Sequence, residues 1–546
     1  MNRALVSITS ISVALIVAAC GSSKSNPQPS GQGGSNGVGG SSDQTGGTTA
    51  GTTGGTTAGT TGGTGAGTTG GSATGGTSTA SSVPQVITSS DGNLWKTGTY
   101  TTGATGTADI TVTDGTQKWT GFGGTFNEAG WDALKALGTS DQQLALKLLY
   151  DATDGANFAY GRIPIGASDY ALTEYTLDDT ANDTSMTNFS IDKDKANLIP
   201  FIQAAIAVKS GIHFWGSPWS PPAWMKSNNS LHSSTKDNPP YADADGFMKD
   251  DATNLAAFAL YLEKFVQEYA KVGITIEAIY PQNEPGYGNP YPSCYWTSDA
   301  YIKFIRDVLG PKFQTDLPNV AIWGGTFSSS SDGTMATNLA SDTAAMAFVK
   351  GFGLQWNTMN KVGSLTSKGP IMMTEHRCGN YNFAVDNKTG GSGDFTWDPN
   401  TQYSSTAPQN DYAYGVETWK WIRDWVKAGV NSYSAWNMVL DTSGANLNKT
   451  TPWHQNALLV VDRAGKKLIQ TPAYYVFRHL SQYVKLPATV SRPTAGDALA
   501  FKNADSSYTV VVYNKDAAKN MIVSIGGTKL QIAAPNNGWV TINYKP

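Results

Sequence analysis

The feature that most constrains the fold of this chain is an alternation of short apolar segments with amphipathic segments across residues 120–436. The apolar segments have the length of buried strands, and the amphipathic ones have the spacing of helices with one buried face. This alternation predicts an α/β fold, the (β/α)8 TIM barrel. The expected strands cover residues 120–124, 158–164, 213–216, 276–281, 320–324, 351–356, 371–374 and 430–436. The expected helices cover residues 142–150, 195–209, 255–270, 300–309 and 417–427.

The end of the chain follows a different pattern, because the helical spacing stops at about residue 485. Apolar and polar residues then alternate in four segments, with turn-forming Gly and Asn residues between them. This predicts an antiparallel β-sandwich domain over residues 486–546. Residues 83–118 are expected to add strands to it, which leaves residues 119–485 for the barrel. The alternating segments are residues 508–513, 521–525, 529–532 and 539–544.

The first 19 residues resemble the signal peptide of a bacterial lipoprotein. Arg3 precedes an apolar run over residues 11–19, and Cys20 follows directly. Cys20 is therefore the expected lipidation site after cleavage. An ordinary cleaved signal and a short membrane anchor are the alternatives, although the run is well short of the ~20 residues that span a bilayer.

Residues 20–82 consist almost entirely of Gly, Ser, Thr and Ala, and TTAGTTGG begins both at Thr48 and at Thr56. Such a segment cannot bury a core, so it is expected to be a disordered tether. An O-glycosylated stalk is the alternative. Together with Cys20, the tether predicts an exported protein, lipid-anchored to a bacterial membrane and facing the periplasm or the cell exterior.

Aromatic side chains are abundant in this sequence, whereas charge is low. The chain has 16 Trp and 24 Tyr, and its formal net charge is −4. This balance gives no basic patch for a nucleic acid. Aromatic faces suit the C–H faces of sugars, although most buried rings in any protein belong to the core.

Two of the expected strands end at a glutamate. Residues 279–285 contain Glu284, and the apolar run in residues 371–376 stops at Glu375. Because barrel active sites form at the carboxyl ends of the strands, both glutamates are candidates. As the ends of strands four and seven, they would face each other across the barrel mouth. For either glutamate alone, a helix cap or a surface ion pair is the alternative.

Two facing carboxylates are what the cleavage of a glycosidic bond requires. One is protonated and donates to the leaving oxygen, while the other is ionised and attacks or assists at the anomeric carbon. The first carboxylate to ionise raises the pKa of the second, which keeps one of them as the acid.

The cysteines are few, and two of them follow the glutamate loops. Cys294 and Cys378 could form a disulfide in an exported protein, and two separate thiols are the alternative, because pairing depends on a Cα separation that the sequence does not give. No CxxC or HxxxH spacing is present. No metal site and no cofactor are therefore expected.

Several motifs follow the expected strands in chain order. The Asn-Glu-Pro at residues 283–285 is similar to the fourth-strand motif of clan A, the large clan of retaining (β/α)8 glycosidases. Together, the motifs resemble glycoside hydrolase family 30, the glucosylceramidase-like enzymes, from about Trp119 to the C-terminus. In that family a β domain packs beside the barrel and takes strands from both chain ends. The other motifs are GFGG at residues 121–124, RIPIGASD at 162–169, SPWSPPAWM at 217–225 and Trp436-Asn437.

The resemblance implies a role for each matching residue. Glu284 would be the general acid/base and Glu375 the nucleophile, ~5 Å apart for retention of configuration. Asn283 would donate to the sugar 2-hydroxyl. Arg162 would hold the nucleophile ionised, with a structural salt bridge as the alternative. Asp169 would bind the outer hydroxyls of the non-reducing sugar. The expected pocket walls, with core packing as the alternative, are Trp219, Trp356 and Trp436.

Two segments depart from the pattern of the family. Residues 355–357 read Gln-Trp-Asn, where glucosylceramidases have a histidine before the Trp and a tyrosine after it. Gln355 is a candidate substrate contact at this position. His376 and Arg377 directly follow the expected nucleophile. His376 is a second candidate for tuning Glu375 or binding substrate, and a structural role is its alternative.

Together, these observations predict a tethered retaining O-glycosyl hydrolase that cleaves a β-glucan or β-glucoside by double displacement. It is expected to be a monomer that meets the membrane only through its lipid anchor. An endo-hydrolase of another β-linked polysaccharide, such as β-1,6-glucan, xylan or galactan, is one alternative. A non-catalytic carbohydrate-binding lipoprotein is another, but it would have no chemical need for both glutamates together with Asn283 and Arg162.

Overall fold

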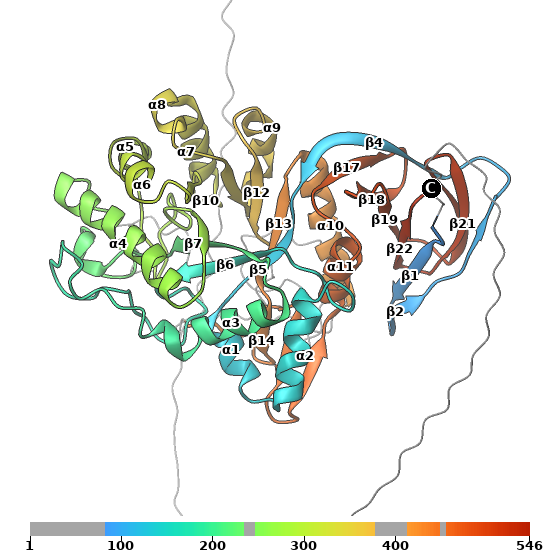
Figure 1. Cartoon of the computed structure of the whole chain (residues 1–546), viewed down its shortest axis with the longest axis horizontal. Coiled ribbons are helices and arrows are strands. Elements are labelled where there is room, and N and C mark those ends of the chain that lie inside the picture. Colours follow the sequence, from blue (N-terminus) through green and yellow to red (C-terminus); the bar gives the residue numbers. More distant parts are fainter. Residues whose placement is uncertain (1–81, 234–245, 377–411, 448–454) are drawn as a thin grey trace, which may run out of the picture. The chain divides into compact units, whose positions relative to one another are not determined.

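A computed structural model describes residues 82–233, 246–376, 412–447 and 455–546 (Figure 1). The chain divides into two units between Thr77 and Ser78, and all described residues belong to the second unit. Cys20, the expected tether up to residue 81, Arg377 and Cys378 lie outside the described residues. Lipidation of Cys20 and a disulfide to Cys378 therefore stay predictions. Within the described ranges, no helix has both the length and the apolar character needed to cross a membrane.

Nine parallel strands form one curled sheet in the order β10-β11-β12-β13-β5-β6-β7-β8-β9. The expected fifth strand, residues 320–324, contains only β9, which pairs with β8, and a second short strand, β10, follows after Gly324 and Gly325 and pairs with β11. At this break between β9 and β10, Gly324 donates to the carbonyl of Gly351 and Gly353 to that of Gly325, at 2.9 and 3.1 Å, so the barrel closes. The (β/α)8 fold is confirmed. The strands are β5 Gly121–Thr125, β6 Tyr160–Ile165, β7 His213–Pro218, β8 Ile276–Ile279, β9 Ala321–Ile322, β10 Thr326–Phe327, β11 Phe352–Gln355, β12 Ile371–Glu375 and β13 Ser432–Asn437.

Helices separate the barrel strands, and several begin at a side chain that satisfies the unpaired N–H groups of the first turn. Asp251 caps α4, Thr297 caps α5, and Ser329 and Asp332 form a capping box at the start of α7. Some helices were not expected from the sequence, because elements as short as α8 and α9 show little periodicity. The helices are α1 Glu128–Leu134, α2 Thr139–Tyr150, η1 Asp194–Ala196, α3 Leu198–Val208, η2 Ala223–Met225, α4 Ala252–Lys271, α5 Ser298–Lys303, η3 Phe304–Leu309, α6 Gly310–Asp316, α7 Ser330–Ser341, α8 Thr343–Met346, η4 Trp356–Lys361, α9 Val362–Leu365, α10 Tyr412–Ala428 and α11 Pro472–Ser481.

A second sheet has ten strands in the order β2-β1-β22-β19-β18-β17-β4-β20-β21-β3. It takes strands from both parts of the chain, since β1 pairs with β22 and β4 with β17, blue beside red in Figure 1. Its pairs are antiparallel except for β20 with β4. Residues such as Val86, Ile110, Val510 and Ile542 form its own core. The expected antiparallel β domain is confirmed. The strands are β1 Gln85–Ser90, β2 Asn93–Thr97, β3 Tyr100–Thr102, β4 Ile110–Trp119, β17 Ala488–Pro493, β18 Asp497–Lys502, β19 Tyr508–Asn514, β20 Lys519–Ile525, β21 Thr528–Ala534 and β22 Gly538–Tyr544.

Hydrogen bonds from the last two helices connect the barrel to this β domain. His479 of α11 lies 2.7 Å from the hydroxyls of both Ser89 and Thr541, and Trp419 of α10 donates to Asp497 at 2.9 Å. A third, small sheet after the eighth barrel strand was not expected. It consists of β14 Val439–Asp441, β15 Leu459–Asp462 and β16 Lys467–Gln470.

Candidate active site

Both candidate glutamates lie at the carboxyl ends of barrel strands. Glu375 is the last residue of β12 and is 5% exposed. Glu284 lies in the loop after β8 with a φ of +48°, a left-handed conformation that costs a non-glycine residue about 1–2 kcal/mol. Two backbone hydrogen bonds hold this loop, from Glu284 to the carbonyl of Thr326 at 3.0 Å and from Asn283 to that of Pro218 at 2.8 Å. Neighbouring strand ends therefore fix the strained backbone.

Arg162 of β6 connects Glu375 to Asn283. Its Nη1 donates to Glu375 Oε2 and its Nη2 to Asn283 Oδ1, both at 2.6 Å. Its Nε and Nη2 also donate to Ser217 Oγ at 3.1 Å. Arg162 is fully buried, so Glu375 faces a positive charge that solvent screens little. Such a pair stabilises the ionised carboxylate.

Three tryptophans surround the guanidinium of Arg162. Its Cζ lies 4.4 Å from the ring centre of Trp219, 5.1 Å from that of Trp215 and 5.3 Å from that of Trp436. Trp219 and Trp436 stack on each other at 5.2 Å. These cation–π contacts orient the guanidinium as well as packing it. The side chain of Trp356 lies outside what the structure describes.

The side chains that donate hydrogen bonds to Glu284 include two neutral amides. Gln355 Nε2 donates to its Oε1 at 3.0 Å, and Asn289 Nδ2 to its Oε2 at 3.4 Å. Burial first, and then the charges of Glu375 and Asp332, raise the pKa of Glu284 to about 8. A glutamate with this pKa is protonated at neutral pH and can act as a general acid.

Asp169, in the loop after β6, adds an unpaired polar atom to the site. It is 5% exposed, and among the described residues its Oδ1 has no hydrogen-bond partner. Burial, followed by the charges of Glu375 and Glu284, raises its pKa. A buried polar atom without a partner costs about 1–3 kcal/mol, which a hydroxyl of a bound ligand would offset.

His376 contacts the helical side of the barrel wall. Its Nδ1 lies 2.6 Å from Tyr433 Oη and its Nε2 3.3 Å from Thr418 Oγ1, and its ring packs on Phe477. Successive side chains of a strand point to opposite faces, so His376 points away from the side that Glu375 faces. Its position favours the structural role over substrate binding.

The side-chain amide of Gln355 contacts Glu284 and Thr374, while its backbone bonds with Thr358 of η4. Besides donating to Glu284, it accepts a hydrogen bond from Thr374 Oγ1 at 3.1 Å, and it is fully buried. The residue that replaces the histidine of glucosylceramidases therefore lies against the expected acid/base. Its contacts favour a role in holding Glu284 over direct contact with the sugar.

Sequence reasoning missed several further residues of this site, including Asn289, which donates to Glu284. Trp215 and Ser217 share one face of β7 with Trp219, so a spacing of two residues along the strand could have identified them. Thr326 donates to Asn283 Oδ1 at 2.7 Å, and Asp332 approaches the Glu284 loop from α7. Neither Thr326 nor Asp332 had a local signal, because each contacts a segment distant in the chain.

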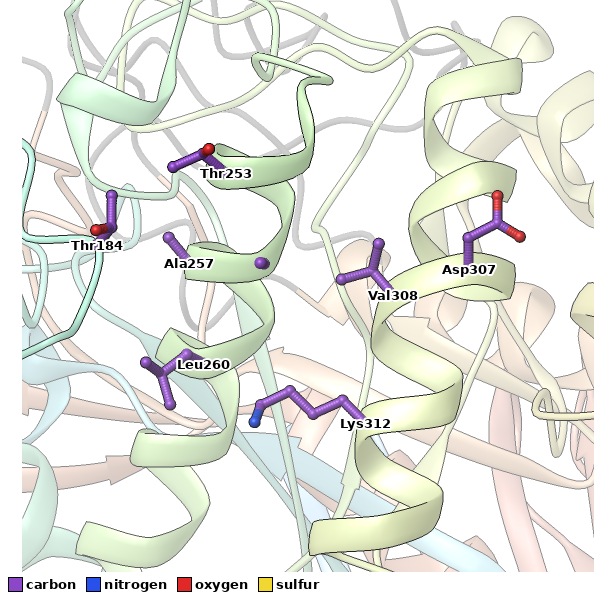
Figure 2. Close-up of a pocket in the computed structure, with 8 residues that line it drawn as sticks. Thr184, Thr253, Ala257, Leu260, Asp307, Val308 and Lys312 are labelled. Carbon is purple, nitrogen blue, oxygen red and sulfur yellow. The ribbon is translucent and has the colours of Figure 1, made fainter.

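A pocket on the helical layer is separate from this site. Figure 2 shows it between α4 and the continuous helix of η3 and α6, with Leu260 and Val308 on facing sides. None of the predicted site residues lines this pocket. Lys312 borders it and forms ion pairs with Glu263 and Asp316 at 2.6 and 2.9 Å. These ion pairs account for the position of Lys312, because the pair with Glu263 joins α4 to α6.

The barrel and its buried carboxylates define a glycoside hydrolase. The sequence profile of the glycosyl hydrolase family 30 TIM-barrel domain matches residues 119–484, and the chain belongs to this family. It is 26% identical to the lysosomal acid glucosylceramidase of Mus musculus over 426 residues, which cover 73% of this chain and 76% of the relative. It is also 26% identical to the endo-1,6-beta-D-glucanase BGN16.3 of Trichoderma harzianum over 417 residues, 73% and 78% of the two chains.

A solved structure, SrfJ from Salmonella typhimurium, shares the fold. The similarity has a TM-score of 0.71 at 21% identity and covers 85% of this chain and 99% of SrfJ. At this identity the similarity shows the fold alone.

Proposed function

We propose that the protein is a retaining β-glycosidase that cleaves β-glucosyl bonds, with Glu375 as nucleophile and Glu284 as general acid/base. The observation that carries this proposal is the unequal environment of the two glutamates. Glu375 lies against the buried cation Arg162, whereas burial and the negative charges of Glu375 and Asp332 raise the pKa of Glu284 to about 8. Double displacement requires one ionised and one protonated carboxyl group.

The first step forms a covalent intermediate. A Glu375 oxygen attacks the anomeric carbon while Glu284 donates its proton to the leaving oxygen, so the glycosidic bond breaks and a glycosyl ester forms. The negative charge of Glu375 is thereby lost, which lowers the pKa of Glu284. Glu284, now ionised, takes a proton from the water that cleaves the ester. The product keeps the β configuration, and both glutamates return to their first states.

Asn283 can assist at the sugar 2-hydroxyl. Its Oδ1 accepts from Arg162 at 2.6 Å and from Thr326 at 2.7 Å. Because a guanidinium can only donate, this side of the amide must be the oxygen. The Nδ2 group then remains to donate to a substrate, a hydrogen bond that can strengthen in the transition state.

The names of the relatives favour glucose as the sugar. One is named a glucosylceramidase and the other an endo-1,6-β-glucanase, and both names denote cleavage next to a glucosyl unit. Asp169, whose Oδ1 has no hydrogen-bond partner among the described residues, would accept from an outer hydroxyl of that unit. An endo-acting β-1,6-glucanase is the second candidate, supported by the Trichoderma relative.

The place of action is also part of the proposal. The sequence features of residues 1–82 support export, lipidation at Cys20 and a tethered catalytic body. When the gene is expressed in a bacterium, the wild-type protein is expected in the membrane fraction with a lipid-modified N-terminal peptide. Lipid anchoring would be contradicted if the wild-type protein left the membrane fraction without detergent, or if Cys20→Ala were distributed between membrane and soluble fractions as wild type is.

Two measurements test the reaction and the sugar. The purified protein is assayed on aryl β-glucoside, β-xyloside and β-galactoside, and on β-1,6-glucan, β-1,3-glucan and xylan. Hydrolysis of the glucoside is expected to exceed that of the other aryl glycosides, with the β anomer as first product by NMR. An activated 2-deoxy-2-fluoro-β-glucoside is expected to label Glu375. An α product, or a label elsewhere, contradicts the mechanism, and binding without hydrolysis supports the carbohydrate-binding alternative.

A further inference from the structure

The carboxylate of Asp332 connects the loop of Glu284 to the loop after β10. Asp332 lies in the first turn of α7, is fully buried, and accepts at Oδ1 from the N–H of Gly286. At Oδ2 it accepts from the N–H and the hydroxyl of Ser328, at 2.9 and 3.0 Å, and from the N–H of Ser329 at 3.2 Å. One side chain therefore fixes two loops at the barrel mouth.

Capping of α7 does not account for all these contacts. In a capping box the acid at the third helical position bonds the N-cap residue, here Ser329. Gly286 belongs instead to a loop 46 residues earlier. A Cβ at Gly286 would collide with Asp332 Oδ1, and Ser331 Oγ donates to the Gly286 carbonyl at 3.1 Å. The first turn of α7 thus holds both backbone groups of Gly286, two residues beyond Glu284.

The charge of Asp332 also acts on Glu284. After burial and the charge of Glu375, it is the next cause that raises the pKa of Glu284, while hydrogen bonds from Ser328 and Gln355 lower it. The titratable and charged groups that act on Glu284 come from two strands or their loops and from one helix. They are Arg162 of β6, Asp169 after β6, Glu375 of β12 and Asp332 of α7.

We propose that Asp332 is a positioning residue for acid/base catalysis, which fixes the Glu284 loop against α7 and keeps Glu284 in its proton-donating state. This inference rests on the proposed function, in which Glu284 is the general acid/base. Asp332 acts through Glu284, while Arg162 holds Glu375 independently. Loss of Asp332 should therefore weaken proton donation more than nucleophilic attack.

The test compares Asp332→Asn with wild type on two substrates. Phenyl β-glucoside needs protonation of its leaving group, whereas 2,4-dinitrophenyl β-glucoside does not. The kcat/KM of the variant is expected to fall about tenfold or more for the phenyl substrate and by less than about threefold for the dinitrophenyl one. The alkaline limb of its pH profile is expected to move to lower pH. Equal losses on both substrates, or an unmoved limb, overturn the proposal.

Asp342→Asn is the matched control, since Asp342 caps α8 through the N–H of Ala345 at 2.9 Å and pairs with Arg306 at 3.0 Å. For this control, the ratio of kcat/KM on the two substrates and the alkaline limb of the pH profile are expected to equal those of wild type. A selective loss on the phenyl substrate in this control overturns the proposal.

A second variant covers the case in which Asp332→Asn does not fold. Gly286→Ala keeps the charge and the capping box but displaces Asp332 Oδ1, and it is expected to show the same selective loss on the phenyl substrate. Equal losses on both substrates in this variant overturn the proposal. A wild type inactive on both substrates overturns the proposed function and this inference together, whereas an active wild type with an unchanged Asp332→Asn overturns the inference alone.

Discussion

Glu375 and Glu284 are the same residue type in one buried site, yet their surroundings are opposite. Glu375 contacts a guanidinium at 2.6 Å, whereas Glu284 contacts two amides and lies near two carboxylates. Water would screen this difference, but a buried site of low dielectric preserves it. The comparison teaches that neighbouring groups assign the catalytic roles, because the residue type alone is compatible with both.

Replacing either of the two glutamates with glycine is expected to have the largest effect on activity. Glu375→Gly and Glu284→Gly are each expected to lower kcat on phenyl β-glucoside by at least about 10³-fold, since each removes an essential group. Azide can enter either vacated space and attack. With 2,4-dinitrophenyl β-glucoside, it should give α-glucosyl azide with Glu375→Gly and β-glucosyl azide with Glu284→Gly, as read by NMR. The reverse pair of anomers would exchange the two roles.

Replacing Arg162, the cation beside Glu375, is expected to have the next largest effect, on both stability and activity. Arg162→Met leaves Glu375 buried without its guanidinium, which should lower the free energy of unfolding by about 3–5 kcal/mol. Arg162→Lys keeps the charge but cannot reach Glu375, Asn283 and Ser217 together, so it should fold and lose activity. Urea denaturation and kcat/KM separate the two effects. A fully active Arg162→Met would show that this cation is dispensable.

The raised pKa of Glu284 predicts that stability declines as pH rises from 4.5 to about 8. Its folded pKa of about 8 exceeds the ordinary 4.5, so the stability from its protonated form is complete below pH 4.5 and is lost as pH rises through about 8. Glu284→Gln removes this dependence. Its unfolding free energy should decline less than that of wild type between pH 5 and 8.5. Glu128, whose pKa burial raises to about 7, stays in both proteins and gives both some decline. If the unfolding free energies of wild type and Glu284→Gln declined in parallel with pH, the raised pKa of Glu284 would be contradicted.

Replacing Gln355 is expected to shift the alkaline limb of the pH profile less than replacing Asp332 does, and in the opposite direction. Its hydrogen bond lowers the pKa of Glu284, so Gln355→Leu should move the alkaline limb of kcat/KM to higher pH. A loss of only a few fold in activity is expected near neutral pH, about the value of one hydrogen bond. Gln267→Leu is the control, because Gln267 donates to Glu263 on α4 at 2.7 Å. A limb that moves to lower pH would contradict the assigned contact.

The smallest effect on activity is expected at His376. Its described contacts are with Tyr433, Thr418 and Phe477 on the helical side. His376→Gln should lower the free energy of unfolding by about 1–3 kcal/mol and leave kcat/KM within about threefold of wild type. Thermal unfolding and the glucoside assay measure the two. A large loss of kcat/KM without loss of stability would restore a role in the site.

Much of the fold was predictable because its signals are local. Strand length, helical spacing and alternation were sufficient to predict the eight barrel strands and the terminal β domain. The separation of β9 from β10 at Gly324 and Gly325 was not, because it depends on hydrogen bonds with two different neighbours. The direction of His376 could have been inferred from its place beside Glu375, since adjacent residues of a strand face opposite ways.

The sequence by itself determined the two strand-end glutamates, their order along the barrel and the family. Only the tertiary structure decided that Arg162 joins Glu375 to Asn283, that Gln355 lies on Glu284, and that Asp332 reaches Gly286. These contacts form between segments that chain spacing does not bring together. Electrostatic effects depend on distance and burial, which exist only once the barrel has closed.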